Sequence, residues 1–96
     1  MKNLKKTEHF LYRQWDRGVT DTLLEKLLNN FKNKFKKKTL LIIGSNILKK
    51  YGEKVSNKKV LIIVLKKGVL ITLFYVDDIY NYLKSISGKE NECVIL

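Results

Sequence analysis

Residues 60–76 read VLIIVLKKGVLITLFYV, and this stretch decides the fold. Two runs of β-branched, aliphatic and aromatic residues, 60–65 and 69–76, are joined by the three residues Lys-Lys-Gly. The short connection predicts a β-hairpin in which Gly68 takes the positive φ of a G1 bulge. Apolar side chains occupy successive as well as alternate positions, so we expect two central strands that are covered on both faces.

Two helices are expected near the N-terminus. Residues 8–17 form the first, with Thr7 as its N-cap and Gly18 as the left-handed residue that ends it. Its expected apolar stripe consists of Phe10, Leu11 and Trp15. The second helix begins at Thr20 and Asp21. Its apolar residues at helical spacing are Leu24, Leu27, Leu28, Phe31 and Phe35.

Shorter elements complete the predicted order. Residues 39–43 form a strand, and Ser45 caps a brief helix that ends at Gly52. After the hairpin, Asp77 and Asp78 cap a helix over residues 79–86. The predicted fold is therefore an α+β domain with two N-terminal helices packed on a small antiparallel sheet, a further C-terminal helix, and possible edge-strand residues at 93–96.

Composition restricts the class of protein. The chain has 96 residues, 45% of them hydrophobic, which suits a single domain spanning residues 1–96. Its formal net charge of +11 attracts polyanions, and RNA, DNA, an anionic membrane surface or an acidic protein are the candidates. Cys93 is the one cysteine, and the apolar runs are far shorter than the ~20 residues of a membrane helix. We expect a cytoplasmic protein without membrane insertion.

The only histidine and the only two arginines are spaced four residues apart, at His9, Arg13 and Arg17. On a helix this spacing stacks them along one face. Arginine offers a planar fork of donors that suits a phosphate, and an imidazole moves a proton near neutral pH. The row predicts a phosphate site. The alternative is a set of surface ion pairs with Glu8, Asp16 or Asp21.

Metal-independent RNA cleavage needs a base, an acid and cations for the phosphate. His9 at the start of its helix suits the base, and the two arginines suit the phosphate. Tyr12, Tyr75, Tyr80 or a lysine remain open as the acid. Thr72 interrupts an apolar strand, so its hydroxyl either satisfies a backbone group or faces the cleft.

Lysine clusters are candidates for further RNA contacts, and a solvated helix end or loop is the alternative. The candidate lysines are Lys36, Lys37, Lys38, Lys66 and Lys67. The sequence offers too few suitably placed ligands for a zinc or two-metal site, and Gly44, Gly52 and Gly68 do not have the spacing of a phosphate loop. We therefore expect neither a metal nor a cofactor.

Residues 7–20, TEHFLYRQWDRGVT, resemble the opening H-x-x-x-R-x-x-x-R-G-[I/V]-[S/T] of small bacterial and phage domains of unknown function. Those domains are similar to the barnase, colicin and RelE-type ribonuclease-toxin fold. Their hairpin carries a threonine in a pattern like residues 68–75, GVLITLFY. The resemblance implies a toxin-like, metal-independent endoribonuclease with His9, Arg13, Arg17 and Thr72 as its polar residues, and a neutralising protein partner in many members.

Two other functions stay open. The first is a non-catalytic basic binding module of phage or mobile-element origin that binds nucleic acid or a host protein. The second is a homo-oligomer such as a homodimer, in which another copy covers an apolar sheet face.

Overall fold

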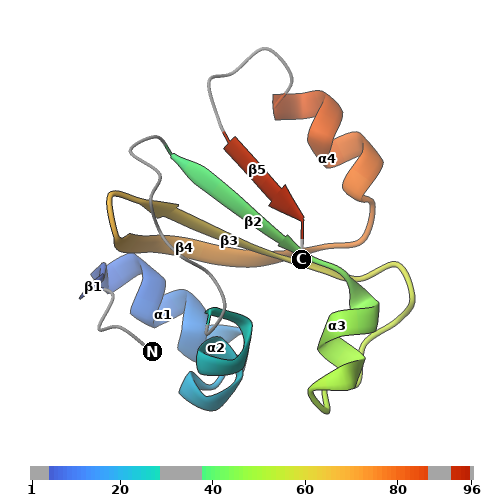
Figure 1. Ribbon diagram of the computed structural model, residues 1–96, viewed down its shortest axis with the longest axis horizontal. Helices are drawn as coiled ribbons and strands as arrows, with labels where there is room; N and C mark the ends of the chain where they lie inside the picture. The colour runs from blue at the N-terminus through green and yellow to red at the C-terminus, as the bar shows by residue number, and fades with distance from the viewer. Residues whose placement is uncertain (1–4, 29–37, 87–91, 96) are drawn as a thin grey trace.

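A mixed five-stranded sheet in the order β1-β4-β3-β2-β5 organises the protein (Figure 1). The computed structural model describes residues 5–28, 38–86 and 92–95. The strands are β1 Lys5–Lys6, β2 Thr39–Ile43, β3 Val60–Lys66, β4 Val69–Val76 and β5 Glu92–Ile95. The helices are α1 Glu8–Asp16, α2 Asp21–Leu28, α3 Ser45–Lys50 and α4 Ile79–Ile86.

The predicted α+β class is confirmed. The strands β2, β3 and β4 are antiparallel, whereas the two edge strands pair in parallel, β1 with β4 and β5 with β2. The strand β1 was not predicted, because two lysines carry no apolar alternation and their pairing with Val69 and Leu70 depends on the folded β4. The edge strand expected at residues 93–96 is present as β5, and Leu96 lies outside the described residues.

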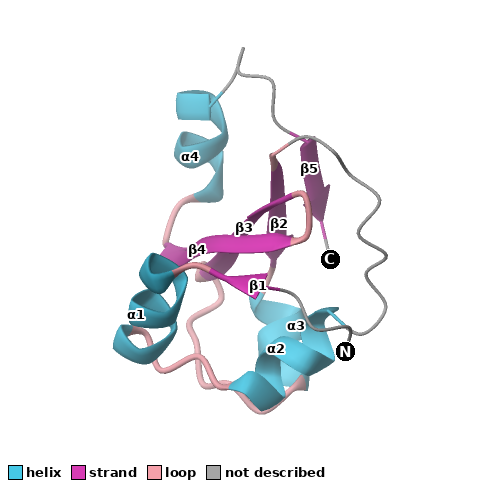
Figure 2. Ribbon diagram, turned by 90° about the vertical axis from the view of Figure 1, so that its left-hand side faces the viewer, coloured by secondary structure: helices cyan, strands magenta, loops and turns pink. Residues whose placement is uncertain are grey.

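Helices cover both faces of the sheet (Figures 1 and 2). On one face α1, α2 and α3 enclose the larger core, in which Phe10, Leu24 and Leu48 are fully buried. On the other face α4 packs Ile79, Tyr82 and Leu83 against a smaller apolar cluster of β2 and β3. Residues of β4 therefore contribute to one core or the other, according to the face of the sheet to which their side chains point.

The hairpin turn is tighter than predicted. Lys66 pairs with Val69, so the turn has two residues, Lys67 with φ 51° and Gly68 with φ 78°. Two successive positive φ angles match a type I′ turn, whose twist suits a hairpin, so the predicted three-residue loop is wrong. The register shifts farther along, where Val64 pairs with Thr72 and Leu65 with Leu70.

Only one hairpin strand is fully central. β3 is buried from Val60 to Leu65, as expected, whereas most of β4 is half-buried. The reason is that β1 pairs with β4 only at its first two residues. The second half of β4 therefore lies near the surface, beside α1.

Thr7 joins α1 to β4. Its hydroxyl accepts a hydrogen bond from the Phe10 amide at 3.0 Å and donates one to the Ile71 carbonyl at 2.8 Å, which confirms the predicted cap. Gly18, with φ 67°, follows the helix as expected. The expected apolar stripe is wrong, because α1 buries Phe10 and leaves Leu11 and Trp15 exposed. These last two share a face that points away from the core.

The remaining caps differ in their chemistry. Thr20 caps α2 by accepting a bond from the Leu23 amide at 3.1 Å. Asp78 caps α4 by accepting from the Asn81 amide at 3.2 Å. Ser45 does not cap α3 as predicted, because its hydroxyl donates instead to the Asn57 carbonyl at 3.0 Å and fastens the loop before β3. Phe31 and Phe35, expected to extend α2, lie outside the described residues.

Candidate anion-binding site

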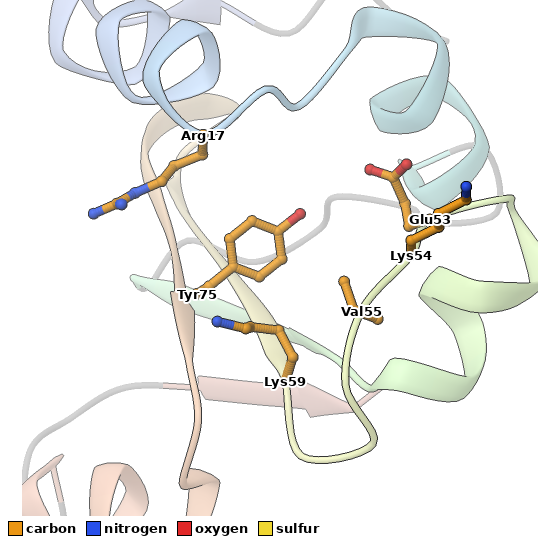
Figure 3. Close-up of a pocket in the computed structure, with 6 residues that line it drawn as sticks. All are labelled: Arg17, Glu53, Lys54, Val55, Lys59 and Tyr75. Atoms are coloured by element: carbon orange, nitrogen blue, oxygen red, sulfur yellow. The ribbon is translucent and has the colours of Figure 1, made fainter.

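A cavity of about 290 Å³ opens between the C-terminal end of α1, the loop after α3 and the last part of β4. Figure 3 shows the side chains that line it. They are Arg17, Glu53, Lys54, Val55, Lys59 and Tyr75. Three cations and one carboxylate line the cavity, so its wall offers more groups that attract an anion than groups that repel one.

Tyr75 lies in the middle of this cavity because of its position in β4. Leu73, two residues earlier, is fully buried against the α1 face, and strand alternation directs Tyr75 to the same face. Figure 3 shows its ring between Arg17 on one side and Glu53 with Lys54 on the other. Burial raises the pKa of the Tyr75 phenol, and the negative charge of Glu53 raises it further. The phenol therefore stays protonated at neutral pH and is a hydrogen-bond donor.

Lys59 is held against the Tyr75 ring. Its Nζ lies 5.9 Å from the ring centroid and 2.9 Å from Asp77 Oδ1. The Asp77 carboxylate is exposed, so the pair is a surface salt bridge of small energy, and Lys59 remains able to meet another anion. Lys54 has no partner among the described residues.

The row predicted on α1 extends from solvent towards this cavity. His9 and Arg17 are exposed and Arg13 is half-buried. Arg17 lines the cavity, whereas His9, eight residues earlier and about 12 Å away along the helix, does not. The predicted ion-pair alternative is present in one case, as Arg17 Nε lies 3.7 Å from Asp16 Oδ2, with both side chains partly exposed.

Arg13 contains an unusual polar atom. Its Nε is buried and has no hydrogen-bond partner in the described part of the chain. A buried donor without an acceptor costs about 1–3 kcal/mol, so an acceptor brought by a ligand or water would stabilise it.

Thr72 lies on the opposite side of the sheet. It pairs with Val64, which belongs to the apolar cluster under α4, and the shifted register carries its side chain to that face. The structure therefore brings Arg17 and Tyr75 together, keeps Arg13 and His9 on the same helix, and does not bring Thr72 to this site.

The predicted basic contacts lie at the other end of the sheet. Lys38 precedes β2, and Lys66 and Lys67 lie at the hairpin tip, where all three are exposed. Lys5 joins this group of lysines, because it pairs with Val69 beside the hairpin tip. Tyr75 pairs with Leu61, so about 20 Å of strand separates this lysine group from the cavity. Lys36 and Lys37 lie outside the described residues.

Sequence reasoning named Tyr75 only as one of several open acids and missed Glu53, Lys54 and Lys59. The period-two pattern of β4 was the available signal for Tyr75, because it continues the buried face of Leu73 beyond the core. The loop that supplies the other three has no periodicity, and its position depends on the bond between Ser45 and Asn57.

No protein-family model, curated protein or solved structure matches the chain. Within the described residues, no helix has the length and apolar character of a membrane span. No group of three or more histidine, cysteine, aspartate or glutamate residues is gathered within those same ranges in a way that suits a metal ion.

Proposed function

We propose that the protein binds RNA and holds a backbone phosphate in the cavity lined by Arg17, Lys59 and Tyr75. One observation carries the proposal, namely a cavity of about 290 Å³ that gathers three cations and a protonated phenol around one carboxylate. Guanidinium, ammonium and phenol groups all donate hydrogen bonds to phosphate oxygens.

Charge outside the cavity favours a polymer over a single phosphate. The net charge is +11, and the lysine group of Lys5, Lys38, Lys66 and Lys67 has no partner among the described side chains. A polyanion bound beside Tyr75 reaches the lysine group across about 20 Å of β4, a length of a few nucleotides. The resemblance of residues 7–20 to ribonuclease-toxin domains favours RNA as that polymer.

Cleavage of the bound RNA is the second candidate, and the position of Glu53 and Tyr75 in one cavity favours it. The 2′-oxygen attacks phosphorus while its proton passes to the Glu53 carboxylate, and the bond from phosphorus to the 5′-oxygen breaks. The Tyr75 phenol gives its proton to that leaving oxygen, which leaves a 2′,3′-cyclic phosphate and a 5′-hydroxyl. Arg17 and Lys59 stabilise the charge that develops on the phosphoryl oxygens.

Fluorescence anisotropy with a labelled single-stranded RNA tests the binding site. Arg17→Ala is expected to weaken binding about ten-fold, because it removes a charged hydrogen-bond donor worth about 1.5 kcal/mol. Lys58→Ala is the matched control, since Lys58 is exposed, adjacent to Lys59 and absent from the cavity wall. Equal losses from both substitutions at about 0.15 M salt reduce the interaction to general charge attraction and contradict the proposed site.

The same samples test cleavage in the presence of a metal chelator. The wild type is expected to form a product with a 2′,3′-cyclic phosphate. Glu53→Gln and Tyr75→Phe are each expected to abolish formation of this product. His9→Ala separates this cavity from a site built on the predicted imidazole base, because loss of cleavage in that variant alone assigns the base to His9. Absence of product across varied RNA sequences removes the second candidate and leaves binding intact.

A further inference from the structure

Three large apolar side chains face solvent on the outer side of α1. Leu11 is 50% exposed, Tyr12 59% and Trp15 78%. The rings of Tyr12 and Trp15 form a pair, with centroids 6.3 Å apart and planes inclined by 42°. Neither ring contributes to the core, since α1 is anchored there by the fully buried Phe10.

This aromatic pair lies on the same helix as the row of His9, Arg13 and Arg17. Tyr12 lies three residues after His9, so these two side chains are surface neighbours on α1, and the acid Asp16 lies one turn beyond Tyr12. Trp15 lies on the last turn, two residues before the cavity residue Arg17, so the two side chains leave the helix on different sides. A strand that extends from the rings to Arg17 therefore passes around the C-terminal end of α1.

We infer that Tyr12 and Trp15 form a stacking platform for unpaired bases of an RNA strand whose phosphate lies at Arg17. The inference rests on the proposed function and defines its substrate as single-stranded RNA. Exposed aromatic faces beside cations are the combination by which proteins hold single strands, and every base has a face to stack. A second copy of the chain fits this surface poorly, because two molecules of charge +11 repel one another.

The fluorescence of Trp15, the only tryptophan in the chain, reports directly on the platform. A short oligoadenylate is expected to quench it in a saturable titration, because the bases stack on the indole. The same length of abasic ribose phosphate, and an RNA duplex, are expected to bind through their phosphates with little quenching.

Affinity measurements with labelled probes give the second arm. Trp15→Ala is expected to weaken oligoadenylate binding about ten-fold and to leave the abasic probe unaffected, whereas Trp15→Phe keeps a ring and most of the affinity. Leu11→Ala removes an apolar neighbour without a ring, and Tyr80→Ala removes a 75%-exposed tyrosine on α4. Neither control is expected to change binding by more than about two-fold.

The outcomes distinguish RNA from a protein partner as the molecule that binds to the Tyr12 and Trp15 surface. Unchanged fluorescence together with unchanged affinity of Trp15→Ala overturns the inference and leaves the surface to a protein partner. A loss from Leu11→Ala as large as that from Trp15→Ala also overturns it, because general apolar contact then explains both. The proposed phosphate site fails separately, if Arg17→Ala binds the abasic probe as tightly as the wild type while Trp15 is still quenched by oligoadenylate.

Discussion

Two polar clusters flank α1, and they differ in how completely their charged groups are paired with one another. In the first cluster, Lys6 Nζ lies 2.6 Å from Asp21 Oδ1 and 3.0 Å from Gln14 Oε1, and Gln14 Nε2 donates to the same Asp21 oxygen at 2.7 Å. In the second, Arg17 and Lys59 surround Tyr75 in an open cavity. The first cluster joins β1, α1 and α2, whereas the residues of the second line a cavity.

The difference separates structural charge from charge that is available to a ligand. Lys6, Gln14 and Asp21 use their hydrogen bonds on one another, so an added anion meets a network that is already neutral. In the cavity, Arg17 and Lys59 each have a single acidic partner, Asp16 at 3.7 Å and Asp77 at 2.9 Å, and no amide side chain such as Gln14 completes a network among the described residues. Substitutions that affect stability and ligand affinity separately test this distinction.

Thr7→Ala is expected to have the largest effect because Thr7 positions α1 for both clusters. It removes the bond to the Phe10 amide and leaves the Ile71 carbonyl without its donor. A lost cap costs about 0.5–2 kcal/mol, and we expect a total of about 2 kcal/mol in the free energy of unfolding. Urea denaturation measures it. Thr7→Ser keeps the hydroxyl and is expected to lose less than half as much, so equal losses contradict this role.

Tyr75→Phe is expected to act on the open cluster alone. Removing the phenol oxygen costs one hydrogen bond to a phosphate, about 1 kcal/mol, which is roughly five-fold in RNA affinity. The ring contact with Lys59 remains, so the unfolding transition is expected to be unchanged. Because the pKa of the Tyr75 phenol is raised, the five-fold ratio is expected to hold from about pH 6 to about pH 9.

Tyr51→Phe is the control for this substitution. Tyr51 has two lysines, Lys26 and Lys50, near its ring but does not line the cavity. A similar loss of RNA affinity from both phenylalanine variants contradicts a specific donor at Tyr75 and favours diffuse attraction to basic residues.

The sequence predicted local structure better than it predicted the site. Thr7, Gly18 and Asp78 act as expected because caps and stops depend on a few neighbouring residues. The faces of α1 and β4 were harder to assign. Phe10 and Trp15 are equally apolar in sequence, and only the packed sheet determines which one is buried.

Thr72 shows that the residues of the candidate site were equally hard to predict from the sequence. A register shift of one residue in β4 determines which face its hydroxyl reaches, and no local pattern marks that shift. The row of His9, Arg13 and Arg17 was visible because helical spacing is local, whereas the approach of Tyr75 and Lys59 to Arg17 requires three separate segments to fold together.

Asp21→Asn is expected to have the smallest effect and to define the closed cluster by its pH dependence. Hydrogen bonds from Lys6, and then from Gln14, lower the pKa of the Asp21 carboxyl below its ordinary value of 3.8. A lowered folded-state pKa stabilises the protein above the unfolded pKa, and this contribution is lost as the pH falls through the folded value. The wild type is therefore expected to be more stable than Asp21→Asn at neutral pH, and the difference is expected to shrink below about pH 4.

Thermal unfolding from about pH 7 to about pH 3 measures this difference in stability. The control is Glu25→Gln on the same helix, because Glu25 lacks such partners among the described residues. A difference that stays constant across this range contradicts a charged network, whereas weakened RNA binding by Asp21→Asn contradicts the separation of the two clusters.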